Sequence, residues 1–304
     1  MNLYAAGFNA WRQLQFSPHV DSLEEPDDIA SFQKVLTDEL IQVRYASLTC
    51  TIVGTSSGLQ YAGVIDEGIE LAALEHELLS NRAAVAGNGM AAVYDGHGAI
   101  VQYASQLRPT EARASQTFSG MRDIVQLVAF ETGFVALSRD GKVWTWGDER
   151  YAATLGRDIT ASSPADRPGL VEDLEDLPTG KIEKIAAGGY TVLALTEGYD
   201  LYAWGGHPAR PPILGTLSGS PSPVDVEEND ILDFSVGEAH IIVLNTGGDV
   251  YIIGDNTNGQ LGLPAERAAT WEKVPLSTAE VGAIIGVKAG HRSSFIVTEN
   301  TCLA

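Results

Sequence analysis

Short apolar runs, separated by glycine-containing turns, recur along the chain. Within these runs the apolar residues favour alternate positions, a period of two that is typical of half-buried β-strands and not of amphipathic helices. Asp140-Gly141 and Gly247-Gly248-Asp249 lie where one run would reverse into the next, and residues of these types favour tight hairpin turns. The pattern therefore predicts a protein made of β-hairpins.

Groups of three such runs form an internal repeat. The clear copies cover residues 124–157, 182–206 and 231–264, and weaker copies cover residues 40–64 and 83–105. The copies begin about 40 to 60 residues apart, which is the repeat length of propeller blades. First strands are expected near Leu40, Ala83, Ile124, Ile182, Ile231 and Ile284. We expect an all-β fold in which residues 1–304 form a single closed β-propeller domain with six blades; seven blades are the alternative.

The two ends of the chain complement each other. The last copy, which starts at Ile284, has only two strands, and Asn2–Gly7 has the pattern of the missing third strand. Pairing of these N- and C-terminal segments would close the ring and protect strand edges from aggregation. Residues 66–81 depart from the repeat, because their apolar side chains have helical spacing among acidic ones. A helical insertion that caps a blade is expected there, with a partner-binding helix as the alternative.

The charge of the chain narrows the classes of partner. Acidic residues outnumber Lys and Arg by 40 to 19, and the formal net charge is −21. A nucleic-acid-binding surface needs clustered Lys and Arg, and the chain has no basic run, so direct binding to DNA or RNA is not expected. The acidity is compatible with a basic protein partner, and it also keeps a protein soluble.

The sequence offers no support for disulfide, metal or cofactor chemistry. Cys50 and Cys302 form no CxxC pair, and the six histidines are scattered singly. Residues 255–259 have a faint likeness to a calcium loop, but they lack the alternating oxygen ligands and the closing Glu. We expect no cofactor, no metal site and no catalytic residue.

The compartment follows from the same observations. Two unpaired cysteines favour a reducing environment. The N-terminal residues do not have the pattern of a signal peptide, and no run approaches the ~20 apolar residues that cross a bilayer. We expect a protein of the nucleus and/or cytoplasm that does not associate with a membrane.

The segment GDNTNGQLGLP, residues 254–264, carries the most specific motif of the chain. It follows a strand, and the segment SVGEAH before that strand ends in a histidine. The motif resembles the repeat of the regulator-of-chromosome-condensation family, and GFNAWRQL, GDERYAATLG and GGHPARPPILG look like degenerate versions of it. The resemblance implies a propeller in which these residues hold the ring and perform no chemistry. They are Gly254, Asn256, Gly259, Gln260, Leu261, Gly262 and His240.

The chain also departs from this family. Its members usually have seven blades, whereas six are counted here, and Thr191 and Gly133 occupy the places equivalent to His240. The kelch propeller is the alternative fold, because Gly188-Gly189 precedes Tyr202 and Trp204. Kelch repeats lack the Gly-Gln-Leu-Gly loop, so the chromosome-condensation type is preferred.

Two functions follow from this resemblance. The preferred one is a non-enzymatic scaffold, a subunit of a hetero-complex whose acidic loops bind a basic or chromatin-associated protein. The alternative is a guanine-nucleotide exchange factor for a Ran-type small GTPase, although no equivalent of a nucleotide-displacing wedge can be identified. The acidic loop residues expected to bind the partner are Asp21, Glu24, Glu25, Asp27, Asp28, Glu172, Asp173, Glu175, Asp176, Asp225, Glu227, Glu228 and Asp230.

Overall fold

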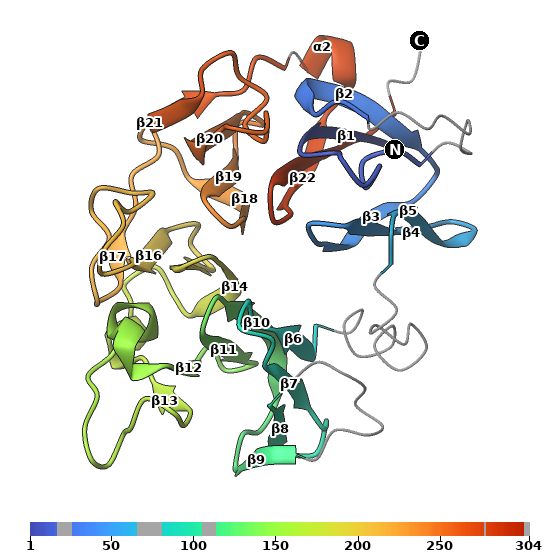
Figure 1. The fold of residues 1–304 in the computed structure, drawn as a ribbon. Coiled ribbons are helices and arrows are strands. Elements are labelled where there is room, and N and C mark those ends of the chain that lie inside the picture. The colour runs from blue at the N-terminus through green and yellow to red at the C-terminus, as the bar shows by residue number, and fades with distance from the viewer. Residues whose placement is uncertain (17–25, 66–80, 105–113, 277, 301–304) are drawn as a thin grey trace. The chain divides into compact units, whose positions relative to one another are not determined.

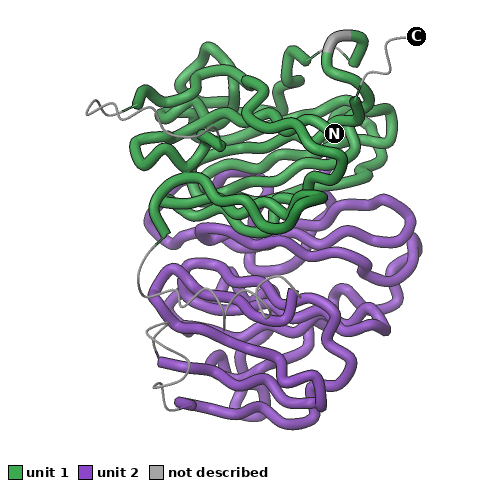
Figure 2. The backbone as a smooth tube through the Cα atoms, turned by 90° about the vertical axis from the view of Figure 1, so that its right-hand side faces the viewer, with its two compact units in different colours: residues 1–66, 226–304 green, residues 67–225 purple. Residues whose placement is uncertain are grey.

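The computed structural model describes residues 1–16, 26–65, 81–104, 114–276 and 278–300 (Figure 1). The expected helical insertion at residues 66–81 falls almost wholly outside the described residues, as do Asp21, Glu24 and Glu25. The chain divides into two compact units, residues 1–66 with 226–304 and residues 67–225 (Figure 2). We describe each unit by itself.

The first unit contains three antiparallel sheets. One has the order β2 (Ile29–Thr37), β1 (Asn2–Gly7), β23 (Ser293–Thr298) and β22 (Ile284–Ala289). The next has the order β18 (Ile231–Val236), β19 (His240–Asn245), β20 (Val250–Asp255) and β21 (Arg267–Lys273). The third contains β3 (Ile41–Ala46), β4 (Cys50–Thr55) and β5 (Gly58–Gly63). A short helix, α2 (Thr278–Val281), precedes β22.

The second unit also contains three antiparallel sheets. One has the order β6 (Ala83–Val85), β7 (Ala91–Tyr94), β8 (Ala99–Tyr103) and β9 (Ala114–Ser119). The next has the order β10 (Ile124–Phe130), β11 (Gly133–Ser138), β12 (Val143–Gly147) and β13 (Gly169–Leu170). The third has the order β14 (Ile182–Gly188), β15 (Thr191–Thr196), β16 (Leu201–Gly205) and β17 (Ser222–Pro223). Two 3-10 helices, η1 (Glu149–Leu155) and η2 (Glu172–Leu174), lie in connections.

The all-β prediction is confirmed, and each sheet begins where the sequence repeat placed a first strand. Five of the sheets have a fourth, outer strand that the three-run repeat did not reveal. Those outer strands are mostly exposed or very short, so they carry a weaker apolar signal than the other three. The expected pairing of the two chain ends is present, with β1 and β23 in register from Asn2 opposite Thr298 to Gly7 opposite Ser293.

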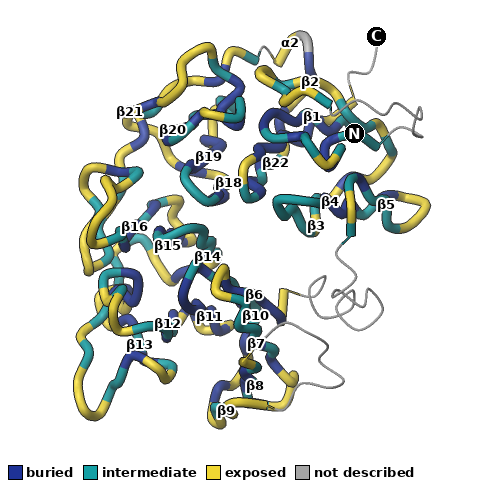
Figure 3. The backbone as a smooth tube through the Cα atoms, viewed as in Figure 1, coloured by how far each residue is buried: buried dark blue, intermediate teal, exposed yellow. Residues whose placement is uncertain are grey.

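In four of the six sheets that the described residues form, the second strand of the repeat is the most deeply buried one. Every residue of β11, β15, β19 and β23 is buried (Figure 3), which explains why these strands are the most continuous apolar runs in the sequence. Apolar side chains of neighbouring sheets pack against each other. Trp204 of β16, for example, lies in one cluster with Val135 of β11 and Leu155 of η1. Its indole Nε1 donates a hydrogen bond to the Thr154 carbonyl at 3.1 Å.

Neighbouring first strands are also joined by polar side chains at β-bulges. Gln126, at a bulge in β10, donates to the Ile185 carbonyl at 2.6 Å and accepts from the Ile185 amide at 3.0 Å. Asp233, at the equivalent bulge in β18, accepts from the Val287 amide at 2.9 Å. Each bulge turns one side chain toward the next sheet of the same unit, so it sets the spacing between the two sheets.

Candidate protein-binding surfaces

Each sheet has two ends with different loops. His240, the first residue of β19, pairs with Gly254 near the end of β20, so the turn before β19 and the loop after β20 lie at one end. The same pairing joins Thr191 to Gly205 and Gly133 to Gly147. We call this the loop end of a sheet. The opposite end, which carries the turn between the second and third strands, is the turn end.

The loop at residues 254–262 is held by its own Asn and Gln side chains. Asn256 donates from Nδ2 to the Leu263 carbonyl at 2.8 Å and accepts from the Leu261 amide at 2.7 Å. Gln260 accepts from the Asn258 amide at 2.9 Å and donates to Asp255 at 2.9 Å. Gly262 has a φ of +64°, and a Cβ there would lie 2.5 Å from the Phe32 ring. The motif residues therefore hold the loop against the neighbouring sheet.

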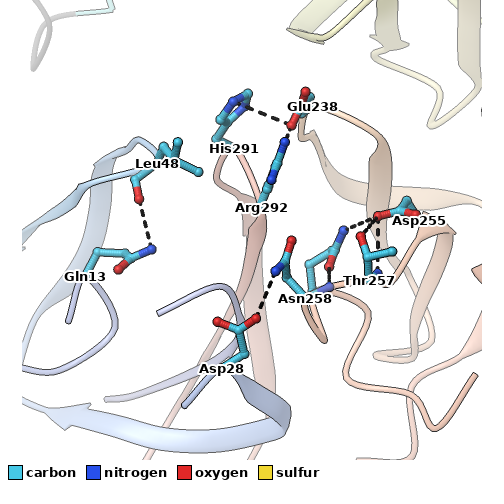
Figure 4. A network of polar contacts seen from close by, with 10 residues as sticks. Gln13, Asp28, Leu48, Glu238, Asp255, Thr257, Asn258, His291 and Arg292 are labelled. Atoms are coloured by element: carbon cyan, nitrogen blue, oxygen red, sulfur yellow. Dashed lines mark hydrogen bonds and ion pairs between the residues drawn. The ribbon is translucent and has the colours of Figure 1, made fainter. Parts of the chain in front are cut away.

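The loop at residues 7–14 repeats this design. Asn9 accepts from the Leu14 amide at 3.1 Å, and Gln13 accepts from the Trp11 amide at 3.0 Å. Gln13 also donates to the Leu48 carbonyl at 2.9 Å, which ties the loop to the β3–β4 turn (Figure 4). Trp11 occupies the position of Asn258 in the other loop, and its side chain is 47% exposed. The first unit thus presents a large aromatic side chain on a braced loop.

Asp28 joins these two loops. Its Oδ1 accepts from the Asn9 amide at 2.9 Å. Its Oδ2 accepts from Asn258 Nδ2 at 2.9 Å, the bond drawn in Figure 4. Asp27 contributes its backbone carbonyl, which accepts from Asn9 Nδ2 at 3.2 Å. Asp28 through its side chain, and Asp27 through its backbone carbonyl, therefore hold loops of their own chain in place. Both belong to the acidic residues at positions 21–28 that were expected to bind a partner.

Charges of both signs meet beside these loops. Glu238, in the turn before β19, accepts from Arg292 Nε at 2.8 Å and lies 3.5 Å from His291 Nε2 (Figure 4). The Glu238 amide also donates to the His291 carbonyl at 3.0 Å. The contacts join the loop ends of two neighbouring sheets. The loop end of the first unit is therefore a mixed-charge surface.

The connection between β13 and β14 carries four of the expected acidic residues at the turn end of its sheet. Val171 and Leu174 are buried and anchor the connection, while the acidic side chains between and after them are exposed. Of these, Glu175 lies 3.7 Å from Lys142 Nζ, a separation at which an exposed pair is weak. The four residues are Glu172, Asp173, Glu175 and Asp176.

The connection between β17 and β18 has the same construction. Val226 is buried, and Asn229 donates from Nδ2 to the Glu227 carbonyl at 2.8 Å. Glu227 and Glu228 have φ values of 53° and 58°, so two successive non-glycine residues adopt the left-handed conformation. The acidic residues of this connection, all exposed, are Asp225, Glu227, Glu228 and Asp230. Within the first unit, Asp28 lies at the loop end and Asp230 at the turn end, so the structure does not bring them together.

Sequence reasoning missed a pocket at the loop end of the second unit. It lies between the loops that follow β12 and β16, and Tyr151 and His207 line it. Tyr190 packs against both rings. The signal available in the sequence was the degeneracy of GDERYAATLG and GGHPARPPILG, which lack the Asn and Gln that hold the other loops.

Among the described residues, no cluster of three or more His, Cys, Asp or Glu side chains has the arrangement needed to hold a metal ion. None of the helices formed by these residues has the length and apolar character needed to span a membrane.

Part of the chain matches the repeat of a known family. The "Regulator of chromosome condensation (RCC1) repeat" matches residues 231–260. The regulator of chromosome condensation of Mus musculus is 32% identical over 153 residues, which are 49% of this chain and 35% of that protein. A second relative, from Drosophila melanogaster, is 29% identical over 200 residues, which are 65% of this chain and 35% of the relative. The matched segments thus span about a third of the length of these curated relatives.

The fold is similar to that of a solved member of this group. Prp20p of Saccharomyces cerevisiae, whose crystal structure was described with its binding properties to Gsp1p and histones, has a TM-score of 0.65. The sequences are 15% identical, and the alignment covers 99% of this chain and 92% of that chain. At 15% identity, this similarity shows the fold alone.

Proposed function

We propose that this chain is a member of the RCC1-like family of β-propeller repeat proteins and a non-enzymatic scaffold that binds a basic segment of a partner protein. The acidic connection before β14 and the acidic connection before β18 are each a binding surface for such a segment. The partner is a nuclear or cytoplasmic protein, and the chain is one subunit of the resulting hetero-complex.

The observation that carries this proposal is the construction of the two acidic connections. Each is anchored by buried apolar residues, Val171 with Leu174 in one and Val226 in the other, and each exposes four acidic side chains. An anchored loop presents its charges with little loss of conformational freedom on binding. Opposite charges on a partner would accelerate the encounter and exclude acidic competitors. Prp20p supports the choice of partner, because histones, which it was reported to bind, are rich in Lys and Arg.

The arrangement of the sheets is part of the proposal. We infer that the six sheets are the blades of one closed propeller domain over residues 1–304, with β1 as the strand that completes the last blade. The pairing of β1 with β23 and the coverage of 99% of the chain by the Prp20p fold support this arrangement. Closure removes the free strand edges at the two chain ends.

Binding of a basic peptide tests the function. The probe is a fluorescein-labelled Lys/Arg-rich peptide of about 20 residues, followed by anisotropy at several salt concentrations. One variant changes Glu172, Asp173, Glu175 and Asp176 to Gln or Asn. We expect binding about tenfold weaker, with a smaller salt dependence, because four favourable charges are lost. A second variant changes Asp225, Glu227, Glu228 and Asp230 in the same way and should behave alike.

The matched control removes the same number of negative charges at other positions of the chain. Glu39, Asp158, Glu266 and Glu272 are exposed and lie outside the two connections, and their neutralisation removes the same four charges. The control should bind the peptide nearly as tightly as the unchanged protein. Equal weakening by all three variants would show a non-specific effect of net charge and would contradict the proposed surface.

Nucleotide exchange is the second candidate, favoured by the reported binding of Prp20p to Gsp1p. It is tested by release of a fluorescent GDP from a Ran-type GTPase. We expect the release rate to be unchanged by stoichiometric protein. An acceleration of about a hundredfold or more would make exchange, which is catalysis by preferential binding of the nucleotide-free state, the function of this chain.

A further inference from the structure

We propose that the pocket at the loop end of the second unit binds a bulky apolar side chain from an acidic segment of a partner protein. The pocket has a volume of about 390 Å³ and lies between η1 and the loop that follows β16. Its apolar lining includes Ala152, Ala153, Pro208 and Pro212. Arginine side chains stand beside this site in place of the carboxylates of the acidic connections, so it requires a different kind of segment.

The loop after β16 lacks the side chains that hydrogen-bond within the loop after β20. In the loop after β20, Asp255 and Asn256 follow the glycine that pairs with the second strand, and they bond to their own loop. After β16, Gly206 and His207 follow the equivalent glycine. No atom lies within 4 Å of the position that a Gly206 Cβ would occupy, so the space is open. Glycine at this position therefore leaves open space where the loop after β20 carries a hydrogen-bonding side chain.

Three packed aromatic rings form one side of this site. The ring centroids of Tyr151 and Tyr190 are 4.9 Å apart, and those of Tyr190 and His207 are 4.7 Å apart. His207 is fixed further, because its Nδ1 accepts from the Ala209 amide at 3.0 Å. The rings come from three different loops, and each is held by the others. Rigid aromatic surfaces of this kind lose little entropy on binding, which is why they often form energetic centres of interfaces.

Two arginines lie beside the pocket in an otherwise acidic protein. From Leu201 to Val224 the chain contains no acidic residue, although it has 40 of them in total, and Arg210 of this stretch lies near enough to Tyr190 to interact with it electrostatically. Arg150 stands at the rim with its side chain 81% exposed. Asp148 takes hydrogen bonds from its Nε and Nη2, which fixes the guanidinium and leaves the Nη1 donors for a further carboxylate. The apolar floor and this rim together select an apolar side chain flanked by Asp or Glu.

Selection from a random library of peptides of about 12 residues tests the site on the full chain. Ala152 is exposed and lines the pocket, so Ala152→Trp fills it. Ala161→Trp is the matched control, since Ala161 is exposed and does not line the pocket. We expect selected peptides to carry Trp, Phe or Leu beside Asp or Glu. They should bind Ala152→Trp about tenfold more weakly or worse, and Ala161→Trp should bind them like the unchanged protein.

Charge reversal provides a second measurement that does not depend on filling the cavity. The double variant Arg150→Glu and Arg210→Glu should weaken the same peptides by about tenfold. Reversal of Arg122 and Arg139, which are exposed elsewhere in the second unit, should not. The binding of the Lys/Arg-rich peptide at the acidic connections should survive Ala152→Trp. Selection of basic peptides, or of peptides that bind Ala152→Trp as well as the unchanged protein, overturns the proposal.

Discussion

His240 illustrates how the environment of a single residue sets its chemistry. The side chain opens β19 and is fully buried, and a Cβ on Gly237 would lie 2.2 Å from its Cε1, so only glycine leaves room for the ring. Its ring nitrogens make no hydrogen bond of standard geometry with the described residues. The Ser293 backbone and Asp255 favour the protonated ring, but burial outweighs them and lowers the pKa of His240 to about 4. The ring is therefore neutral at physiological pH.

This burial predicts a contribution to acid sensitivity. The unfolded chain takes up the proton near the ordinary histidine pKa of 6.5, whereas the folded chain takes it up only near 4. Above pH 6.5 the ring is neutral in both states, so His240 does not lower the free energy of unfolding. As the pH falls from 6.5 to 4, the unfolded chain binds the proton first, and the free energy of unfolding decreases by on the order of 3 kcal/mol. Urea unfolding of His240→Leu across this range should show correspondingly less pH dependence than the unchanged protein.

The control for this measurement is His97→Gln, which changes an exposed histidine. It should keep the pH dependence of the unchanged protein. Identical pH profiles for His240→Leu and the unchanged protein would show that His240 does not titrate differently in the folded and unfolded states.

At the scale of elements, two loops with different sequences reach one conformation through the same polar contacts. Asn9 and Asn256 both accept from the amide of a leucine five residues further along, and Gln13 and Gln260 both accept an amide within their own loop. Trp11 and Asn258 stand at the equivalent position, where Trp11 is exposed and Asn258 is half-buried. The Asn and Gln hydrogen bonds that form the frame of each loop thus do not involve the side chain at the position of Trp11 and Asn258. That side chain can differ between loops of one conformation, so one fold can offer different surfaces.

Asn256→Ala tests this frame. Its loss leaves the Leu261 amide and the Leu263 carbonyl without their partner inside the loop. Because unsatisfied buried polar groups are costly, we expect the free energy of unfolding to fall by about 2–3 kcal/mol. Asn258→Ala, in the same loop, removes only a contact to the exposed Asp28 and should cost less than about 1 kcal/mol. Urea titration measures both, and equal losses would contradict a framing role for Asn256.

At the scale of the whole molecule, β1 is the element that joins the start of the chain to its end. It lies between β2 and β23, with Ala5 opposite Gln33 on one side and Phe295 on the other. Leu3 and Ala5 are fully buried in a cluster that also contains Val53 and Ile41 of the next sheet. The strand therefore supplies both backbone pairing and core.

Ala5→Pro should disrupt this junction. Proline removes a backbone donor from a central strand, and the expected loss of stability is about 3 kcal/mol or more. Ala269→Pro is the control, because Ala269 is exposed in the edge strand β21 at a break in the register. Thermal unfolding should show a large decrease in Tm for Ala5→Pro and a small one for Ala269→Pro. Similar decreases would mean that β1 is no more important than an edge strand.

The sequence by itself determined the features that have local causes. A period of two and glycine turns depend on neighbouring residues, so the strands, their repeat and the loop motif at Gly254–Gly262 could be predicted. The pairing of β1 with β23 was predictable because one repeat lacked a strand and the other end of the chain supplied it.

Tertiary structure alone decided which residues meet. Asp28 and Asn258 are 230 positions apart, and no local pattern shows that their hydrogen bond makes Asp28 a brace between loops. Likewise, the pocket beside Tyr151 and His207 arises where two loops about fifty residues apart face each other, and the burial of His240 depends on the room left by Gly237. Contacts of this kind depend on how the sheets pack, because packing brings distant side chains together and excludes water from them.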